Sequence, residues 1–480
     1  MDMKKLFLYL VALAAFGWGI FFTLEKGRTL TPPALTAPEF PAKPASDNAT
    51  NQEPSSSLLA NMLENFQHPL TRLFVQMILI LLAARVCGAL VTKIHEPAVI
   101  GEMIAGVLLG PSLLGWLWPE FFHFVFPEES LGSLRLFSQI GVCLFMFIVG
   151  MELDVTELKK QARTAVLVSQ VSIFFPYLLG VVSALFLYST LAGPNTTFLT
   201  FALFIGISMS ITAFPVLARI LEERAMTKTA LGTTAIACAA VGDVTAWIIL
   251  AFVVTIAKAG NVASAAFSIS LVVLFVFFML FFIKRRLPKW LDKKPHQNDV
   301  TSKGVMASVL VFLFASALAT DVMGIHALFG SFLAGVVMPA RKKFRDSLKH
   351  QLDNFSSVFL LPLFFAFTGL RTQIGLLNDA NGWMICLGLI LVAMIGKLGG
   401  TMLTARMTGV NWVDSFALGA LMNTRGLVEL IALNIGYDLG ILSPRIFTML
   451  VIMALVTTFL TGPLLSWCDF LRSRKSATAH

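Results

Sequence analysis

An aspartate in an almost wholly apolar stretch is the first residue that could do chemistry. Asp243 lies in AVGDVTAWIILA, near the middle of an apolar segment that covers 229–257, and residues of opposite charge are distant from it in the sequence. An ionised carboxylate in such surroundings is costly, and by default it marks an ion path or a proton relay. The alternative interpretation is a structural ion pair with another segment.

Lys397 is the second deeply placed charge, in MIGKLGGTMLTARMTG within the segment 383–406. It lies over a dozen residues from the start of that segment and several from its end, which argues against snorkelling to a membrane interface. We therefore interpret Lys397 as a charge partner that could neutralise Asp243 when no cation is bound.

A proline follows a run of hydroxyl residues in the segment 196–218, which contains GISMSITAFPVLARI. Ser208, Ser210 and Thr212 precede Pro215. Proline removes a backbone hydrogen bond and clashes with the preceding turn, and nearby hydroxyls can satisfy the freed groups. A simple kink and an interrupted helix are both consistent with this stretch.

A second polar interruption, from Asn423 and Thr424 to Gly426, lies in GALMNTRGLVELIALN within 412–436. One interrupted segment in each half of a chain indicates an inverted-repeat transporter, whose half-helix ends expose carbonyls and amides that can coordinate an ion. The residues that we predict to line such an ion site are Ser208, Ser210, Thr212, Asn423 and Thr424.

Arg425 and Glu429 stand four residues apart beside the second interruption. That spacing places both side chains on one helix face, where they can pair. We favour a structural ion pair over a direct ligand role for Glu429.

These residues belong to a strongly hydrophobic chain. Of 480 residues, 57% are hydrophobic and only 13% are charged, and the mean hydropathy is +0.80. Apolar segments long enough to cross a bilayer recur along it, which predicts an all-α polytopic membrane protein. The thirteen segments are 69–92, 97–117, 133–151, 163–189, 196–218, 229–257, 263–284, 304–321, 323–339, 357–371, 383–406, 412–436 and 444–466.

Charge in the connections predicts the orientation. RILEERAMTK, KRRLPKWLDKKPHQ and ARKKFRDSLKH occupy alternate connections, whereas the opposite ones carry almost no Lys or Arg. The positive-inside rule then places the C-terminus in the cytoplasm. Basic loops also explain the net charge of +9 without a nucleic-acid partner.

The chain divides into four parts. Residues 1–24 are a signal anchor or a signal peptide, and the lack of a clean cleavage site favours an anchor, which makes fourteen spans in all. Residues 25–66 form a Pro/Ala/Ser-rich extracytoplasmic linker, 67–468 the membrane domain, and 469–480 a short basic cytoplasmic tail. The five cysteines show no metal or redox spacing, and no phosphate loop, zinc pattern or nucleophile elbow is present in the sequence.

Eight motifs occur in order: EPAVIGEMIAGVLLGPSLLG, GVCLFMFIVGMELD, SITAFPVLARIL, GDVTAW, GIHALFGSFLAGVVMP, TGLRTQIGLL, GKLGGTMLTARMTG and NTRGLVELIALNIG. Over about 69–468 they resemble the monovalent cation:proton antiporters of the Kef/CHX type, within the sodium/proton exchanger superfamily. The resemblance implies a 13-span inverted-repeat domain with crossed broken helices, a homodimer and elevator-like alternating access. It also implies that the family's aspartate is Asp243 and its buried basic residue Lys397.

Two departures from the family matter. The residue before the aspartate is usually Asp, Asn or Gln, but here it is Gly242, which removes a side-chain ligand or a second carboxylate. The chain also ends shortly after the last segment, so gating through the nucleotide-sensing domain of Kef-type proteins is not expected.

The sequence therefore predicts a secondary antiporter, not an enzyme, in a bacterial inner membrane. It would exchange K⁺ or Na⁺ for H⁺, with Asp243 binding the monovalent cation or the proton and with no other cofactor. A cation channel or uniporter is the alternative, although no filter-like motif is visible. A single acid favours electroneutral exchange, whereas release of a second proton from Lys397 would make it electrogenic.

Overall fold

The structure is a computed structural model that describes residues 3–30, 68–93, 96–152, 162–194, 196–258, 262–292, 303–324, 326–339 and 341–477. Most of the predicted linker and the last three residues of the predicted tail lie outside the described residues. The described chain is helical apart from one isolated β-bridge, between Ala192 and Leu442. The fold class is thus the all-helical one that the hydropathy predicts.

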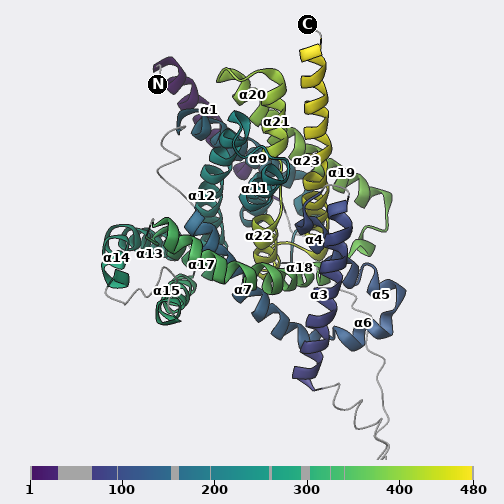
Figure 1. Ribbon diagram of the computed structural model, residues 1–480. Coiled ribbons are helices and arrows are strands. Elements are labelled where there is room, and N and C mark those ends of the chain that lie inside the picture. Colours follow the sequence, from purple (N-terminus) through teal and green to yellow (C-terminus); the bar gives the residue numbers. More distant parts are fainter. Residues whose placement is uncertain are drawn as a thin grey trace, which may run out of the picture.

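The larger helices run as follows (Figure 1): α1 Met3–Gly27, α3 Pro69–Lys93, α4 Ala98–Leu109, α7 Leu131–Glu152, α9 Ala162–Leu191, α10 Phe198–Ser210, α11 Phe214–Glu223, α12 Ala230–Lys258, α13 Val262–Phe278, α14 Lys284–Asp292, α15 Lys303–Val322, α16 Ala327–Val336, α17 Lys342–Phe355, α18 Leu361–Leu370, α19 Ala380–Met394, α20 Gly400–Met407, α21 Trp412–Met422, α22 Leu427–Asp438 and α23 Pro444–Ala477. Shorter pieces are α5 Leu114–Leu117, α6 Pro119–Val125 and the 3₁₀ turns Glu128–Ser130 and Ile374–Leu376. Three π-helical turns, Met279–Ile283, Ser356–Leu360 and Ile395–Gly399, lie within longer helical runs.

Eleven helical stretches of the described chain are long and apolar enough to cross a membrane. The pair α21 and α22, bent by 42° at their break, makes a twelfth if it is one span. The predicted segment 323–339 contains only the ten-residue helix α16, which is shorter than a full crossing. The protein is therefore a polytopic membrane protein with eleven to twelve candidate spans.

The helices pack into two groups (Figure 1). One, here called the site bundle, contains α9, α10, α11, α12, α19, α20, α21, α22 and α23. The other, here called the scaffold bundle, contains α3, α4, α7, α15, α16, α17 and α18. Helix α1 lies against α9 of the site bundle, with the rings of Phe16 and Phe175 6.0 Å apart.

Close helix crossings use glycine in both bundles. A Cβ on Gly180 of α9 would lie 2.8 Å from the Cα of Gly206 on α10, and one on Gly106 of α4 would lie 2.3 Å from the carbonyl oxygen of Phe365 on α18. Inside a membrane, close backbone approach through small residues is a main source of helix association. These glycines therefore set how tightly each bundle packs.

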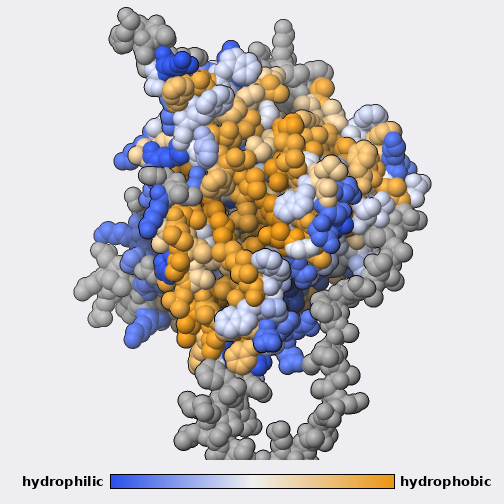
Figure 2. Space-filling model, turned by 90° about the vertical axis from the view of Figure 1, so that its right-hand side faces the viewer, coloured by the Kyte–Doolittle hydropathy of each residue, from blue (hydrophilic) through white to orange (hydrophobic). Residues whose placement is uncertain are grey.

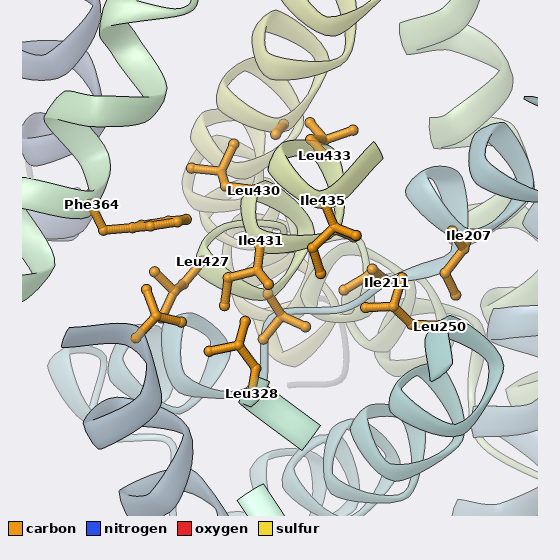
Figure 3. Packing of buried hydrophobic residues seen from close by; sticks show 14 of the residues in the cluster. Ile207, Ile211, Leu250, Leu328, Phe364, Leu427, Leu430, Ile431, Leu433 and Ile435 are labelled. Carbon is orange, nitrogen blue, oxygen red and sulfur yellow. The ribbon is translucent and has the colours of Figure 1, made fainter. Parts of the chain in front are cut away.

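Hydrophobic residues cover both the outside and the inside of the protein. Figure 2 shows one face whose middle is largely hydrophobic, with hydrophilic residues toward its edges. Inside, the residues of α22 pack between Phe364 of α18 and Ile211 and Leu250 of the site bundle (Figure 3). This packing holds the second interrupted helix against the scaffold bundle.

Candidate functional site

The first interruption is an extended segment, Ile211–Ala213, between α10 and α11. Pro215 lies in the first turn of α11, where the missing amide hydrogen costs no intrahelical bond. The proline therefore begins a new helix rather than kinking a continuous one. Of the two interpretations of this stretch, the structure has the interrupted helix.

The second interruption, Asn423–Gly426 between α21 and α22, lies against the first. The backbone amide of Ala213 donates to the carbonyl oxygen of Thr424 at 3.0 Å, and the hydroxyl of Thr212 donates to the carbonyl oxygen of Met422 at 3.0 Å. Each extended segment thus satisfies part of the other's backbone, which lets non-helical chain exist inside the protein.

Two basic side chains bind the carbonyl end of α10. Lys397 donates to the carbonyl oxygen of Ser210, and Arg425 donates to those of Ser208 at 2.6 Å and Met209 at 2.8 Å. The last carbonyls of a helix have no intrahelical partner and carry its negative dipole end, so cations stabilise them. Lys397 and Arg425 are therefore held by this helix end.

The hydroxyls predicted to line the site mostly satisfy backbone groups. Those of Ser208 and Ser210 donate to Phe204 and Gly206 of their own helix, each at 2.7 Å, and that of Thr424 donates to Leu421 at 2.6 Å. The exception is Asn423, whose side-chain oxygen and nitrogen are both buried without a partner among the described residues. Asn423 is thus the predicted polar residue that still has both its donor and its acceptor groups to offer.

Asp243 lies within α12, 1% exposed. The backbone amide of Phe214, at the start of α11, is directed toward its carboxylate as a weak hydrogen-bond donor, and the charge of Lys397 also acts on it. Neither carboxylate oxygen has a hydrogen bond of good geometry in the described part of the chain. Lys397 is near enough to act on Asp243 electrostatically, but its hydrogen bond goes to Ser210 and not to this carboxylate.

Arg425 and Glu429 form an ion pair at 3.0 Å, and both side chains are fully buried. Glu429 lies in the first turn of α22, where the amide end of the helix also favours a negative charge. One of its two oxygens has no partner in the described chain. The two residues pair as predicted, but Arg425 lies in the interruption just before α22, so the pair joins the interruption to the first turn of the helix and does not lie on one helix face.

Three buried hydroxyls that sequence reasoning missed also lack a partner among the described residues: Ser169 and Ser172 on α9 and Thr401 on α20. Pro176 of α9 lies within a continuous helix and marks no interruption, and isolated hydroxyls are ordinary in membrane helices. Their only signal is structural, because a buried hydroxyl normally finds a partner.

The boundary between the two bundles is closed by ion pairs near the start of α23 and contains a cavity further along this helix. Near the start of α23, Asp438 pairs with Arg371 at 2.7 Å and with Arg135 at 3.0 Å, beside a pocket of only about 30 Å³. Near its end, a cavity of about 470 Å³ is lined by Glu96, Glu223, Arg224 and five other residues. Burial raises the pKa of Glu96 to about 7, against the opposing effect of Arg224.

Taken together, an all-helical membrane fold and a buried acid without a well-formed hydrogen bond in the described chain, beside two helix interruptions that contact each other, are the arrangement expected of an ion transporter. The described residues contain no group of three or more His, Cys, Asp or Glu that could hold a metal ion.

The transmembrane sodium/hydrogen exchanger family model matches residues 78–468, so the chain belongs to the sodium/hydrogen exchanger family. This confirms the family that the motifs indicate. The family is one of transporters, not of enzymes, and the class of this protein is that of the monovalent cation/proton antiporters.

Among its relatives, the Na⁺/H⁺ antiporter NhaS4 of Synechocystis is 42% identical over 393 residues, which cover 82% of this chain and 96% of that protein. The K⁺/H⁺ antiporter 1 of Saccharomyces cerevisiae is 34% identical over 407 residues, covering 83% and 46%. The chain spans about half the length of the yeast and plant relatives that it matches. The solved sodium proton antiporter MjNhaP1 of Methanocaldococcus jannaschii covers 83% of this chain and 97% of its own, with a TM-score of 0.53 and 13% identity, and so shares the fold.

Proposed function

We propose that this protein exchanges K⁺ or Na⁺ for H⁺ by alternating access, with Asp243 as the group that binds either the cation or the proton. The observation that carries this proposal is the state of Asp243: a buried carboxylate that has no well-formed hydrogen bond among the described residues and only the amide end of α11 directed toward it. A buried charge without a partner is costly, so this carboxylate needs a cation or a proton.

Competition for one carboxylate couples the two fluxes. The acid can bind a proton or a cation but not both well, and moving the bare anion past apolar walls is prohibitively costly. The loaded forms, which carry either ion, would therefore be the ones that change access. In this scheme one proton exchanges for one cation, and transport is electroneutral.

The contrast between the two ends of the boundary between the bundles supports a conformation that is open on one side of the membrane and closed on the other. The cavity of about 470 Å³ near the end of α23 would be the open side, and the ion-paired boundary at Asp438 the closed side. With the C-terminus in the cytoplasm, as the basic loops predict, the open side faces inward. A thirteen-span inverted repeat, a homodimer and an inner-membrane location complete the proposal, and they rest on the motif resemblance.

The transported cation in this proposal is either sodium or potassium. The relatives include a Na⁺/H⁺ antiporter, a K⁺/H⁺ antiporter and the Na⁺/H⁺-K⁺ antiporter GerN of Bacillus cereus. Both ions are therefore tested side by side in the experiment below.

The test is ion flux in proteoliposomes with an imposed pH gradient. We expect K⁺ or Na⁺ uptake that requires counterflow of protons, and no uptake by the Asp243→Asn variant. A cation flux without obligatory proton counterflow would identify a channel or uniporter instead, and normal exchange by Asp243→Asn would move the ion site elsewhere.

A further inference from the structure

Gly242, the residue before Asp243, has no side chain, and the hydroxyl of Ser169 on another helix lies beside this position. A Cβ built on Gly242 would lie 3.3 Å from the hydroxyl oxygen of Ser169 on α9 and 3.8 Å from Cδ1 of Ile173. The space that a side chain at position 242 would enter is thus bordered by Ser169. The hydroxyl oxygen is its closest neighbour there.

Contacts between α9 and α12 hold this register. Gln170, next to Ser169, donates from its amide to the hydroxyl of Thr245 at 3.0 Å, and Thr245 in turn donates to the carbonyl oxygen of Val241 on its own helix at 3.0 Å. These bonds bracket Gly242 and Asp243 along α12. The position of Ser169 beside them is therefore set by the packing of the two helices.

Ser169 behaves unlike most buried hydroxyls of this protein. A serine in a helix usually donates to the carbonyl four residues earlier, as the partly buried Ser183 does to Leu179 on the same helix at 2.8 Å. Ser169 is 0% exposed, and its oxygen has no partner in the described chain. A buried polar group left without a partner needs an explanation, and an absent ion is one.

In the described chain, unpartnered buried oxygens occur on three elements of the site bundle. They belong to Ser169 and Ser172, three residues apart on α9, to both carboxylate atoms of Asp243 on α12, and to Asn423 at the second interruption. An alkali cation that leaves water must regain several oxygen ligands in place of its hydration shell. Hydroxyl, amide and carboxylate oxygens are all suited to that role.

We propose that the hydroxyl of Ser169 is a ligand of the transported monovalent cation, supplying from α9 the neutral oxygen that Gly242 cannot supply from α12. This inference rests on the proposed function of Asp243. A hydroxyl has two lone pairs for a cation and one hydrogen, so it can also accept a bond from protonated Asp243 or donate one to the carboxylate. Because the added ligand is neutral, Asp243 stays the single acid that carries charge.

The test compares Ser169→Ala with Ser183→Ala in proteoliposomes. Both variants remove one hydroxyl from α9, but the Ser183 hydroxyl is already bonded within its own helix. Loss of one ligand to a charged group should raise the apparent KM for Na⁺ or K⁺ about tenfold in Ser169→Ala, with the maximal rate largely kept. Ser183→Ala should keep the wild-type KM.

A second measurement separates a ligand from a packing residue. Purified protein is heated in NaCl, in KCl and in choline chloride at equal ionic strength. In choline, Ser169→Ala should be at least as stable as the wild type, since the removed hydroxyl had no partner to lose. The rise in Tm caused by Na⁺ or K⁺ should shrink in this variant and persist in Ser183→Ala.

The outcomes also separate this inference from the proposal on which it rests. If Asp243→Asn abolishes exchange while Ser169→Ala keeps the wild-type KM and the full cation-dependent rise in Tm, Ser169 is not a ligand and only this inference fails. A lower Tm of Ser169→Ala in choline, with an unchanged KM, would likewise assign Ser169 to packing. If Asp243→Asn exchanges normally, the proposed function itself fails.

Discussion

Asp243 and Glu429 are both buried acids near the start of a second half-helix, yet their surroundings differ. Asp243 is on α12, across from the start of α11, and among the described residues neither of its oxygens has a hydrogen bond of good geometry. Glu429 is within α22 itself and is paired with Arg425 at 3.0 Å. Asp243, on a separate helix, remains available to bind a cation or a proton, whereas Glu429, inside the interrupted helix, is already neutralised by Arg425.

The two buried basic residues, Arg425 and Lys397, also differ in their contacts. Arg425 serves two purposes, pairing with Glu429 and binding the carbonyls of Ser208 and Met209. Lys397 binds the carbonyl of Ser210 and stays near Asp243 without bonding it. A buried pair with additional hydrogen bonds is a structural device, and an unpaired buried carboxylate is a functional one. The comparison therefore supports our proposal that Asp243 carries the ion, and it leads us to expect a structural role for Glu429.

The largest effect is expected at Asp243. Asparagine keeps the shape of the side chain but cannot ionise, so Asp243→Asn should lower coupled exchange at least about a hundredfold while the protein still folds. The measurement is pH-gradient-driven Na⁺ and K⁺ uptake by purified protein of verified thermal stability. Exchange at the wild-type rate in this variant would show that Asp243 does not carry the transported ion.

Glu429→Gln should instead cost stability. The substitution leaves Arg425 buried without its counter-charge, and removing one partner of a buried pair costs about 3 kcal/mol. We expect a lower Tm and a lower yield, with exchange per folded molecule close to that of the wild type. A variant with normal Tm and no exchange would show that Glu429 is a transport acid after all.

The Lys397→Ala variant tests, by the charge that transport moves across the membrane, whether Asp243 is the single acid that carries protons. With Asp243 as the single acid, the wild type should give no steady cation-evoked current on a solid-supported membrane, and the variant should give none either. Since Lys397 binds the end of α10, we expect its loss to slow exchange about tenfold by removing one cation from that helix end. A steady current in the wild type that disappears in Lys397→Ala, with exchange retained, would make Lys397 a second proton carrier.

The smallest effects are expected at the interruptions. The side-chain amide of Asn423 has no partner among the described residues, whereas the hydroxyl of Thr212 is already bonded to Met422. Asn423→Ala should raise the apparent KM for the cation about fivefold, as expected for a loss of about 1 kcal/mol. Thr212→Val should mainly lower Tm, through the same loss of about 1 kcal/mol in the folded state. Equal KM values for Asn423→Ala and the wild type would remove Asn423 from the ion site.

Much of this molecule could be predicted from its sequence, because a bilayer constrains the chain so strongly. Apolar segments must be helices, since backbone groups have no water to bond with. The polar run from Asn423 to Gly426 marked the second interruption, Pro215 marked the first with a simple kink as the alternative, and the spacing of Arg425 and Glu429 predicted their ion pair, although Arg425 lies outside the helix. These are local signals, in which residues near each other in the sequence decide the result.

What only the tertiary structure decided is which polar groups have partners. The sequence favoured Lys397 as the partner of Asp243, but the fold brings its ammonium to the carbonyl of Ser210, 187 residues away. Ser208 and Ser210 look like ion ligands in the sequence and donate within their own helix, while Ser169 looks ordinary and lies unpartnered beside Gly242. The physical reason is that hydrogen-bond partners across helices depend on crossing and register, and no local pattern in a uniformly apolar chain encodes either.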